Sequence, residues 1–137
     1  MASWLVKTEP GEYSWADLVR DRRTQWDGIT NPQAQLNLRA MAEGDTVVVY
    51  HSQTDKAAVG LANVVRAAYP DPTDANGKRV WVDIAPVRPL ARAVTLAEMK
   101  AEPLFATSPL VRQSRLSVVS LTDEQLAVIV RLGSGAE

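Results

Sequence analysis

The residues best placed to do chemistry follow one apolar run, Val47 to Tyr50, which ends on His51 and Ser52. A histidine beside a serine raises the question of acyl transfer, in which the serine attacks a carbonyl and the histidine takes its proton. Neighbouring residues of a β-strand point to opposite faces. His51 and Ser52 therefore cannot serve each other as base and nucleophile while the strand continues.

Other catalytic and metal chemistry is also poorly supported. The 137-residue sequence has one histidine and no cysteine, whereas a catalytic zinc site takes about three protein ligands. It has no glycine-rich phosphate loop. Among its 16 acidic residues, no spacing singles out a pair for glycoside hydrolysis. We expect no enzymatic activity, no metal site and no cofactor.

Ligand binding is better supported, because aromatic and polar residues gather around the same strand. Tyr50 and Ser52 share a strand face, and Trp26 lies in a polar loop. A pocket walled by the two aromatic rings would suit a planar polar ligand such as a nucleobase, with hydrogen bonds from Lys7, Asn31 and Ser52. Stacking contributes about 1–3 kcal/mol per base, and edge hydrogen bonds select the base. The spacing leaves open that both rings are ordinary core residues.

Short periodic segments separated by turns must position these residues, and the chain length fits one domain, residues 1–137. We predict strands at 3–7, 46–51, 58–66, 80–87 and 116–120, and helices that begin after the N-caps Ser14, Asn31, Thr95 and Thr122. The unbroken valines of 46–51 predict a central strand. Gly60 predicts a bulge or a close backbone approach. This order predicts an α+β fold, with a mixed or antiparallel sheet curling towards a barrel.

The net charge of −1 counts against a general electrostatic nucleic-acid binder. Locally, residues 103–122 contain no acid but include Arg112 and Arg115, which either guide a phosphate backbone or form a solvated surface. The N-terminal residues read as neither a signal peptide nor a membrane span. We expect a soluble, cytoplasmic monomer with no membrane partner.

Seven stretches, in order along nearly the whole chain, carry a family resemblance. They read WLVKTEP (4–10), YSWADL (13–18), WDGITNPQA (26–34), LRAMAEGDTVVVYHS (38–52), AYPDPT (68–73), WVDIAPV (81–87) and PLVRQSRLSV (109–118). Together they resemble the EVE domain family, a branch of the PUA-like superfamily. The resemblance implies a PUA-like fold, a curled β-barrel or mixed sheet flanked by helices, and a non-enzymatic role.

EVE domains are regarded as readers of modified bases, above all cytosine derivatives in DNA, and are similar to YTH domains, which read methylated adenine in RNA. The resemblance implies binding of a base such as 5-methyl- or 5-hydroxymethylcytosine in nucleic acid, DNA more than RNA. The base would leave the stack, which costs a few kcal/mol, and enter an aromatic pocket. By similarity the pocket residues are Lys7, Thr8, Trp26, Asn31, Tyr50, His51, Ser52, Ser114 and Leu116, with Arg112, Gln113 and Arg115 towards the phosphates.

The chain departs from the family pattern at Thr8, Thr30, Gln35 and Leu36. The family often has serine at the first position, a basic residue at the second, and Arg-Asn at the last pair. The lost basic residues agree with the net charge of −1. Other interpretations remain: an RNA-binding module, a module for a small planar ligand or nucleotide, an interaction module of a larger nucleic-acid defence or repair system, or an enzyme using His51.

Overall fold

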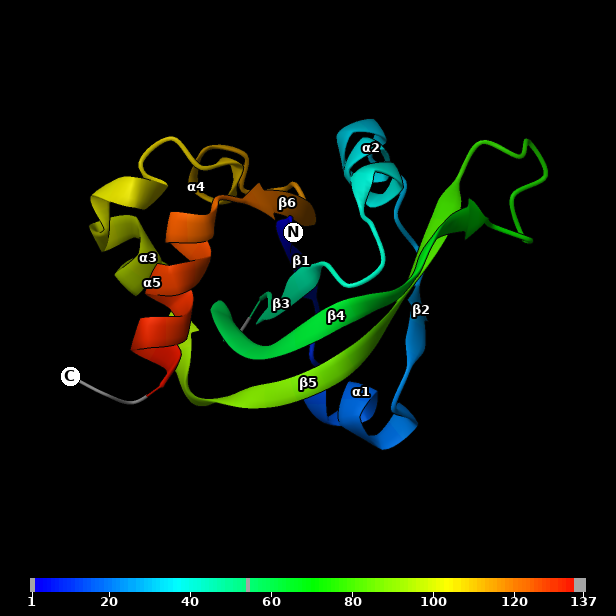
Figure 1. Cartoon of the computed structure of the whole chain (residues 1–137). Coiled ribbons are helices and arrows are strands. Elements are labelled where there is room, and N and C mark those ends of the chain that lie inside the picture. Colours follow the sequence, from blue (N-terminus) through cyan, green and yellow to red (C-terminus); the bar gives the residue numbers. More distant parts are fainter. Residues whose placement is uncertain (1, 54, 135–137) are drawn as a thin grey trace.

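A computed structural model describes residues 2–53 and 55–134 as an α+β fold built on one mixed six-stranded sheet (Figure 1). The strands lie in the order β2 (Thr24–Trp26), β5 (Val80–Thr95), β4 (Ala57–Pro70), β3 (Thr46–His51), β1 (Ser3–Thr8), β6 (Val118–Leu121). β1 and β3 are parallel, and the other pairs are antiparallel. β2 and β6 stand at opposite ends of this order, so the sheet curls but does not close. The predicted α+β class and mixed sheet are confirmed.

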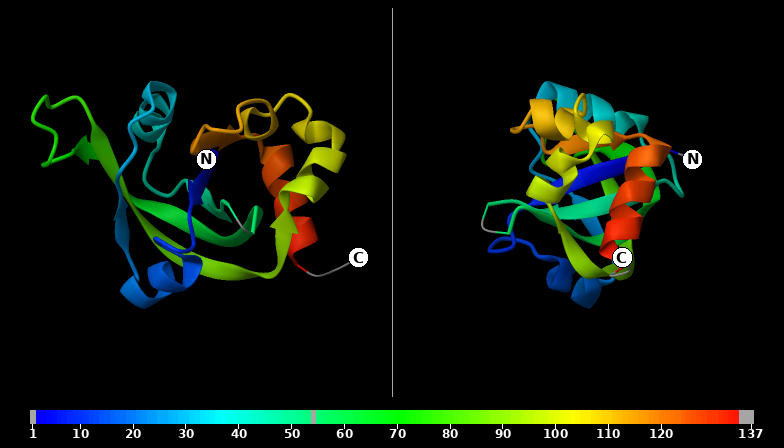
Figure 2. Two further views of the ribbon diagram at one scale, coloured as in Figure 1. Left: turned by 180° about the vertical axis from the view of Figure 1, so that it is seen from behind. Right: turned by 90° about the vertical axis from the view of Figure 1, so that its left-hand side faces the viewer.

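Four helices begin at the predicted caps, and a fifth, of one turn, begins after Ser108, which was not predicted as a cap. They are α1 (Trp15–Asp21), α2 (Pro32–Ala40), α3 (Leu96–Ala101), α4 (Pro109–Arg112) and α5 (Asp123–Gly133), with a 3-10 turn, η1 (Pro103–Phe105). Ser14, Thr95 and Thr122 each form a capping box, and Asn31 accepts from the Ala34 N–H. The helices α3, α4 and α5 gather at one end of the molecule, away from α2 and the tip of the β4–β5 hairpin (Figures 1 and 2). Within the described ranges, no helix has the length and apolar character needed to cross a membrane.

β3 occupies the centre of the sheet, as its valines predict. It lies between β1 and β4, and Val47, Val48 and Val49 are buried. Opposite Val49 is Gly60, beside a register shift in the ladder. A Cβ atom at Gly60 would lie 2.6 Å from carbon atoms of the Trp15 ring. Gly60 is therefore required by the close approach of α1 to the sheet, and the predicted irregularity is confirmed.

Three elements differ from the sequence predictions. β4 and β5 run on to Pro70 and Thr95, past the predicted ends at 66 and 87, and form a long hairpin. The sequence predicts that Pro86 lies at the end of its strand, at an edge or a bulge. The strand continues, but Pro86 does pair with Ala62 beside a register shift, an irregularity that accommodates a residue without a backbone N–H. β2, which pairs with residues 82–84, was not predicted.

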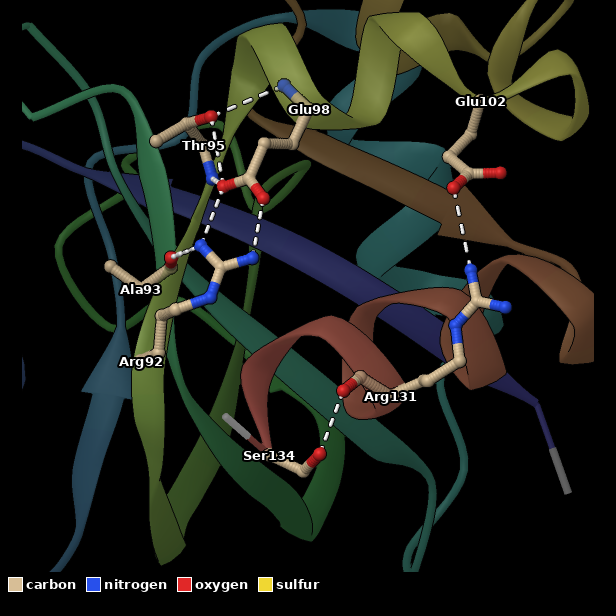
Figure 3. Close-up of polar contacts among 7 residues, drawn as sticks. All are labelled: Arg92, Ala93, Thr95, Glu98, Glu102, Arg131 and Ser134. Carbon is tan, nitrogen blue, oxygen red and sulfur yellow. Dashed lines mark hydrogen bonds and ion pairs between the residues drawn. The ribbon is translucent and has the colours of Figure 1, made fainter. Parts of the chain in front are cut away.

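Two ion pairs connect the elements at one end of the molecule (Figure 3). One joins the end of β5 to α3, and the other joins α5 to the residue that follows α3. Arg92 Nη1 donates to Glu98 Oε1 at 2.8 Å, and the same carboxylate accepts from the Thr95 N–H at 3.1 Å. The hydrogen bond from Arg92, which has the largest effect, and the bond from the Thr95 N–H lower the pKa of Glu98 to about 2. Arg131 Nη2 lies 3.3 Å from Glu102 Oε1. These ion pairs therefore link β5, α3 and α5 at this end of the molecule.

Candidate functional site

A cavity of about 1020 Å³ opens where the end of β1 meets β2 and the segment before β6. Its volume is at the upper end of the range for small-molecule sites, about 300–1,000 Å³. The lining comes from five stretches of the chain: Lys7 to Glu9, Glu12 and Tyr13, Asp21 with Arg23 to Ile29, Ser52 and Gln53, and Ser114 and Arg115 with Ser117. Side chains far apart in the sequence thus face one space.

Six of the predicted site residues line this cavity: Lys7, Thr8, Trp26, Ser52, Ser114 and Arg115. Hydrogen bonds join their segments. Lys7 Nζ donates to the Ser114 carbonyl at 2.9 Å, and the Ser52 N–H donates to the Thr8 carbonyl at 2.9 Å. Burial lowers the pKa of the Lys7 ammonium. The parallel pairing of β1 and β3 brings these groups together, because both strands end at this edge.

Tyr50, Asn31 and Leu116 are placed elsewhere. Tyr50 is 3% exposed, and it approaches the cavity only through Lys7, whose ammonium lies 5.8 Å from the centroid of its ring. Asn31 caps α2, and Leu116 is buried. None of the three lines the cavity. Their contacts with a base stay predictions.

Among the residues predicted to face phosphates, some line the cavity and others do not. Arg115 lines the cavity, whereas Arg112 Nε donates to the Ala106 carbonyl at 3.1 Å. Gln113 is the C-cap of α4, and its backbone N–H donates to the Pro109 carbonyl. The segment is thus a folded turn that presents Ser114 and Arg115 to the cavity.

His51 holds the start of α1. Its Nε2 accepts from the Trp15 N–H at 2.9 Å, and its Nδ1 lies 3.1 Å from Asp55 Oδ2. These partners fit a neutral ring that carries its proton on Nδ1, with both nitrogens engaged. His51 therefore supports the wall of the site through α1 and does not line the cavity.

The second aromatic wall is Tyr13, which the sequence reasoning missed. The Tyr13 and Trp26 rings meet edge to face, with centroids 6.4 Å apart and an interplanar angle of 84°. The Tyr13 hydroxyl donates to Asp21 Oδ2 at 2.8 Å, and burial raises the pKa of this hydroxyl. Trp26 is 6% exposed, so it belongs both to the core and to the cavity lining. Tyr13 takes the place that the sequence assigned to Tyr50.

Charges of both signs surround the cavity. Its carboxylates are Glu9, Glu12, Asp21 and Asp27, and its cations are Lys7, Arg23 and Arg115. Arg23 pairs with Asp83 at 2.9 Å, which leaves few cations for phosphates. Carboxylates are the acceptors that recognise the amino group of cytosine. In the described part of the chain, no cluster of three or more histidine or acidic residues could hold a metal ion.

Comparisons with known proteins identify the family and the fold. The sequence model of the EVE domain matches residues 2–132. The NMR structure of Rpa0253 from Rhodopseudomonas palustris is 45% identical, with a TM-score of 0.93 over 100% of this chain and 96% of that one. The crystal structure of the human THYN1 protein in complex with 5-methylcytosine-containing DNA is 29% identical, with a TM-score of 0.90 over 100% of both chains. Thymocyte nuclear protein 1 from Homo sapiens is 32% identical over 164 residues, 94% of this chain and 72% of that protein.

Proposed function

The chain belongs to the EVE domain family, and on that premise we propose that it binds nucleic acid carrying a modified base, a cytosine derivative in DNA. The observation that carries the proposal is the cavity walled by Trp26 and Tyr13, in a chain whose fold matches that of human THYN1. THYN1 was crystallised with 5-methylcytosine-containing DNA. The cavity here offers aromatic walls together with carboxylate acceptors.

Recognition begins when the base leaves the duplex, because a stacked base cannot reach an enclosed site. Extrusion costs a few kcal/mol, which contacts in the cavity must offset. The Tyr13 ring and the exposed part of Trp26 contact the base. A carboxylate of the lining, such as Asp21 or Asp27, accepts from the exocyclic amino group.

The methyl group sets the expected selectivity. Burying one methyl-sized group is worth about 0.8 kcal/mol, which corresponds to about fourfold in affinity. Ile29 and Trp26 supply apolar surface in the lining. Simple burial against them therefore predicts a preference of about fourfold for 5-methylcytosine over cytosine, and a directed contact would raise it.

The proposal includes no catalytic step, metal or cofactor. Both ring nitrogens of His51 already have partners, which supports a structural role for the only histidine. The proposal also takes the protein to act as a monomer, since a single chain supplies every wall of the cavity. It keeps the cytoplasmic location that the sequence predicts.

A second candidate is a module for a free nucleoside or another small planar ligand without phosphates. The carboxylates around the cavity favour it, because they repel a phosphate backbone. The two candidates differ in salt dependence: a protein that neutralises several phosphates loses affinity steeply as salt rises, whereas one that binds a neutral ligand does not.

The test is a titration of labelled oligonucleotides that contain cytosine, 5-methylcytosine or 5-hydroxymethylcytosine, in DNA and in RNA, at about 50 and 200 mM salt. The proposal predicts tighter binding to one modified DNA, by about fourfold or more. Equal binding to every oligonucleotide would contradict it. Free 5-methylcytidine that competes as well as the modified DNA, with no dependence on salt, would establish the second candidate instead.

A further inference from the structure

A second cavity, of about 370 Å³, adjoins the first. Both are lined by Asp27, Gly28 and Ile29, so this loop between β2 and α2 separates them. Gly28 has a φ of 73°, a left-handed conformation that glycine adopts without strain. The remaining lining residues are Gln35, Asp71, Thr73, Arg79 and Trp81. The volume is within the range of small-ligand sites.

The hairpin loop that carries Arg79 is held by backbone hydrogen bonds. Asp74 accepts from the N–H groups of Lys78, at 2.8 Å, and Arg79, at 2.7 Å. These hydrogen bonds, of which the bond from the Arg79 N–H has the largest effect, hold the pKa of the Asp74 carboxyl below its usual range. The Asp71 N–H donates to the Arg79 carbonyl at 3.0 Å. The backbone of Arg79 is therefore fixed where its side chain lines the cavity.

The guanidinium of Arg79 is available for a ligand. The residue is exposed, and it takes part in none of the ion pairs among the described residues. A guanidinium presents its donors in a planar fork, which matches two adjacent acceptors. Arg79 and Asp27 both line the cavity, so it offers a guanidinium donor and a carboxylate acceptor.

Trp81 is the aromatic residue of the cavity lining. Its ring packs edge to face against Tyr69, with centroids 6.2 Å apart. Its indole N–H is buried and has no hydrogen-bond partner among residues 2–53 and 55–134. Trp81 thus gives the cavity an aromatic wall, and its N–H is enclosed within the protein.

We propose that the second cavity is a subsite for the base next to the modified one, and that guanine is the base it accepts best. The inference rests on the proposed function, since the first cavity must hold the modified base. Guanine presents two adjacent acceptors, O6 and N7, which an arginine fork contacts in the commonest specific pairing. Its amino group donates, and Asp27 can accept. The shared loop brings the two bases into neighbouring cavities.

The experiment uses DNA with one modified cytosine and each of the four bases on either side of it. The wild-type protein is expected to prefer guanine on one side by about fivefold or more, the lower end of what one bidentate contact supplies. Arg79→Gln is expected to lose this preference but to keep the preference for modified over unmodified cytosine. Arg79→Lys keeps the charge without the fork, and it is expected to lose most of the guanine preference as well.

Lys78→Gln is the matched control. Lys78 is the neighbouring exposed cation on the same loop and does not line the cavity, so its variant is expected to retain the guanine preference. If Arg79→Gln weakens binding equally for all four neighbouring bases, Arg79 contacts a phosphate and the subsite is refuted. Equal wild-type binding to all four neighbours also refutes the subsite, while a retained preference for modified cytosine leaves the proposed function standing. If the wild-type protein shows no preference for modified cytosine, both the subsite and the proposed function are overturned.

Discussion

Replacing Trp26 by leucine tests whether its ring acts in binding as well as in the core. Trp26 is 6% exposed and packs with the buried residues of the sheet. The change to leucine is expected to cost about 2–4 kcal/mol of stability, somewhat less than the cost of about 3–5 kcal/mol for tryptophan to alanine. It also removes one aromatic wall of the cavity. A contact between a base and an aromatic ring is worth about 1–3 kcal/mol, so affinity for modified DNA is expected to fall about 5- to 150-fold.

Trp4→Leu is the matched control, because Trp4 is 7% exposed and does not line the cavity. Its indole N–H donates to Asp45 at 3.0 Å, so its loss of stability is expected to equal or exceed that of Trp26→Leu. Urea unfolding measures stability, and oligonucleotide titration at about 10–20 °C, near maximum stability, measures affinity on folded protein. The reasoning is refuted if folded Trp26→Leu binds modified DNA like the wild type, or if Trp4→Leu loses as much affinity.

Two further predictions concern stability. In Gly60→Ala the new Cβ meets the Trp15 ring at 2.6 Å, and overpacking is expected to cost about 1–3 kcal/mol in urea unfolding; an unchanged midpoint would show that the ring yields freely. Glu98 has a pKa of about 2 in the folded protein, below its ordinary value of 4.5, so its stabilisation is present above about pH 4.5 and is lost as the pH falls towards 2. Glu98→Gln is therefore expected to be less stable than the wild type at pH 7, by about 0.2–1 kcal/mol for a partly exposed pair with Arg92, and a gap that does not close on acidification contradicts this.

The sequence predicts the parts of the fold that depend on local chemistry. The capping boxes at Ser14, Thr95 and Thr122 mark helix starts because their partners lie three residues away. β2 and the long ends of β4 and β5 could not be predicted in this way. β2 has three residues and exists through its pairing with β5. The proline at position 86 of β5 suggests a strand end, but a register shift accommodates it within the long hairpin.

The site is harder to predict, because its residues meet only through the sheet. Lys7 and Ser114 are 107 residues apart, and the family resemblance, not local spacing, grouped them. Strand alternation favoured Tyr50 as a cavity wall, whereas its ring is buried and does not line the cavity, so its contact with a base stays a prediction. Tyr13 precedes α1 in an irregular segment, where no periodicity indicates which way a side chain points.

Gln35 shows that a departure from the family pattern here does more than remove a basic residue. Its side chain is 6% exposed; Nε2 donates to the Ile29 carbonyl at 2.8 Å, and Oε1 accepts from the Val80 N–H at 2.9 Å. The neutral amide thus ties the loop that separates the two cavities to β5. A charge in this buried position would need a compensating partner. Because the loop is fixed without a cation and carboxylates surround the first cavity, selectivity should come from contacts with bases. The affinity for modified DNA should fall with salt less steeply than for a protein that neutralises many phosphates, but more steeply than the affinity for free 5-methylcytidine.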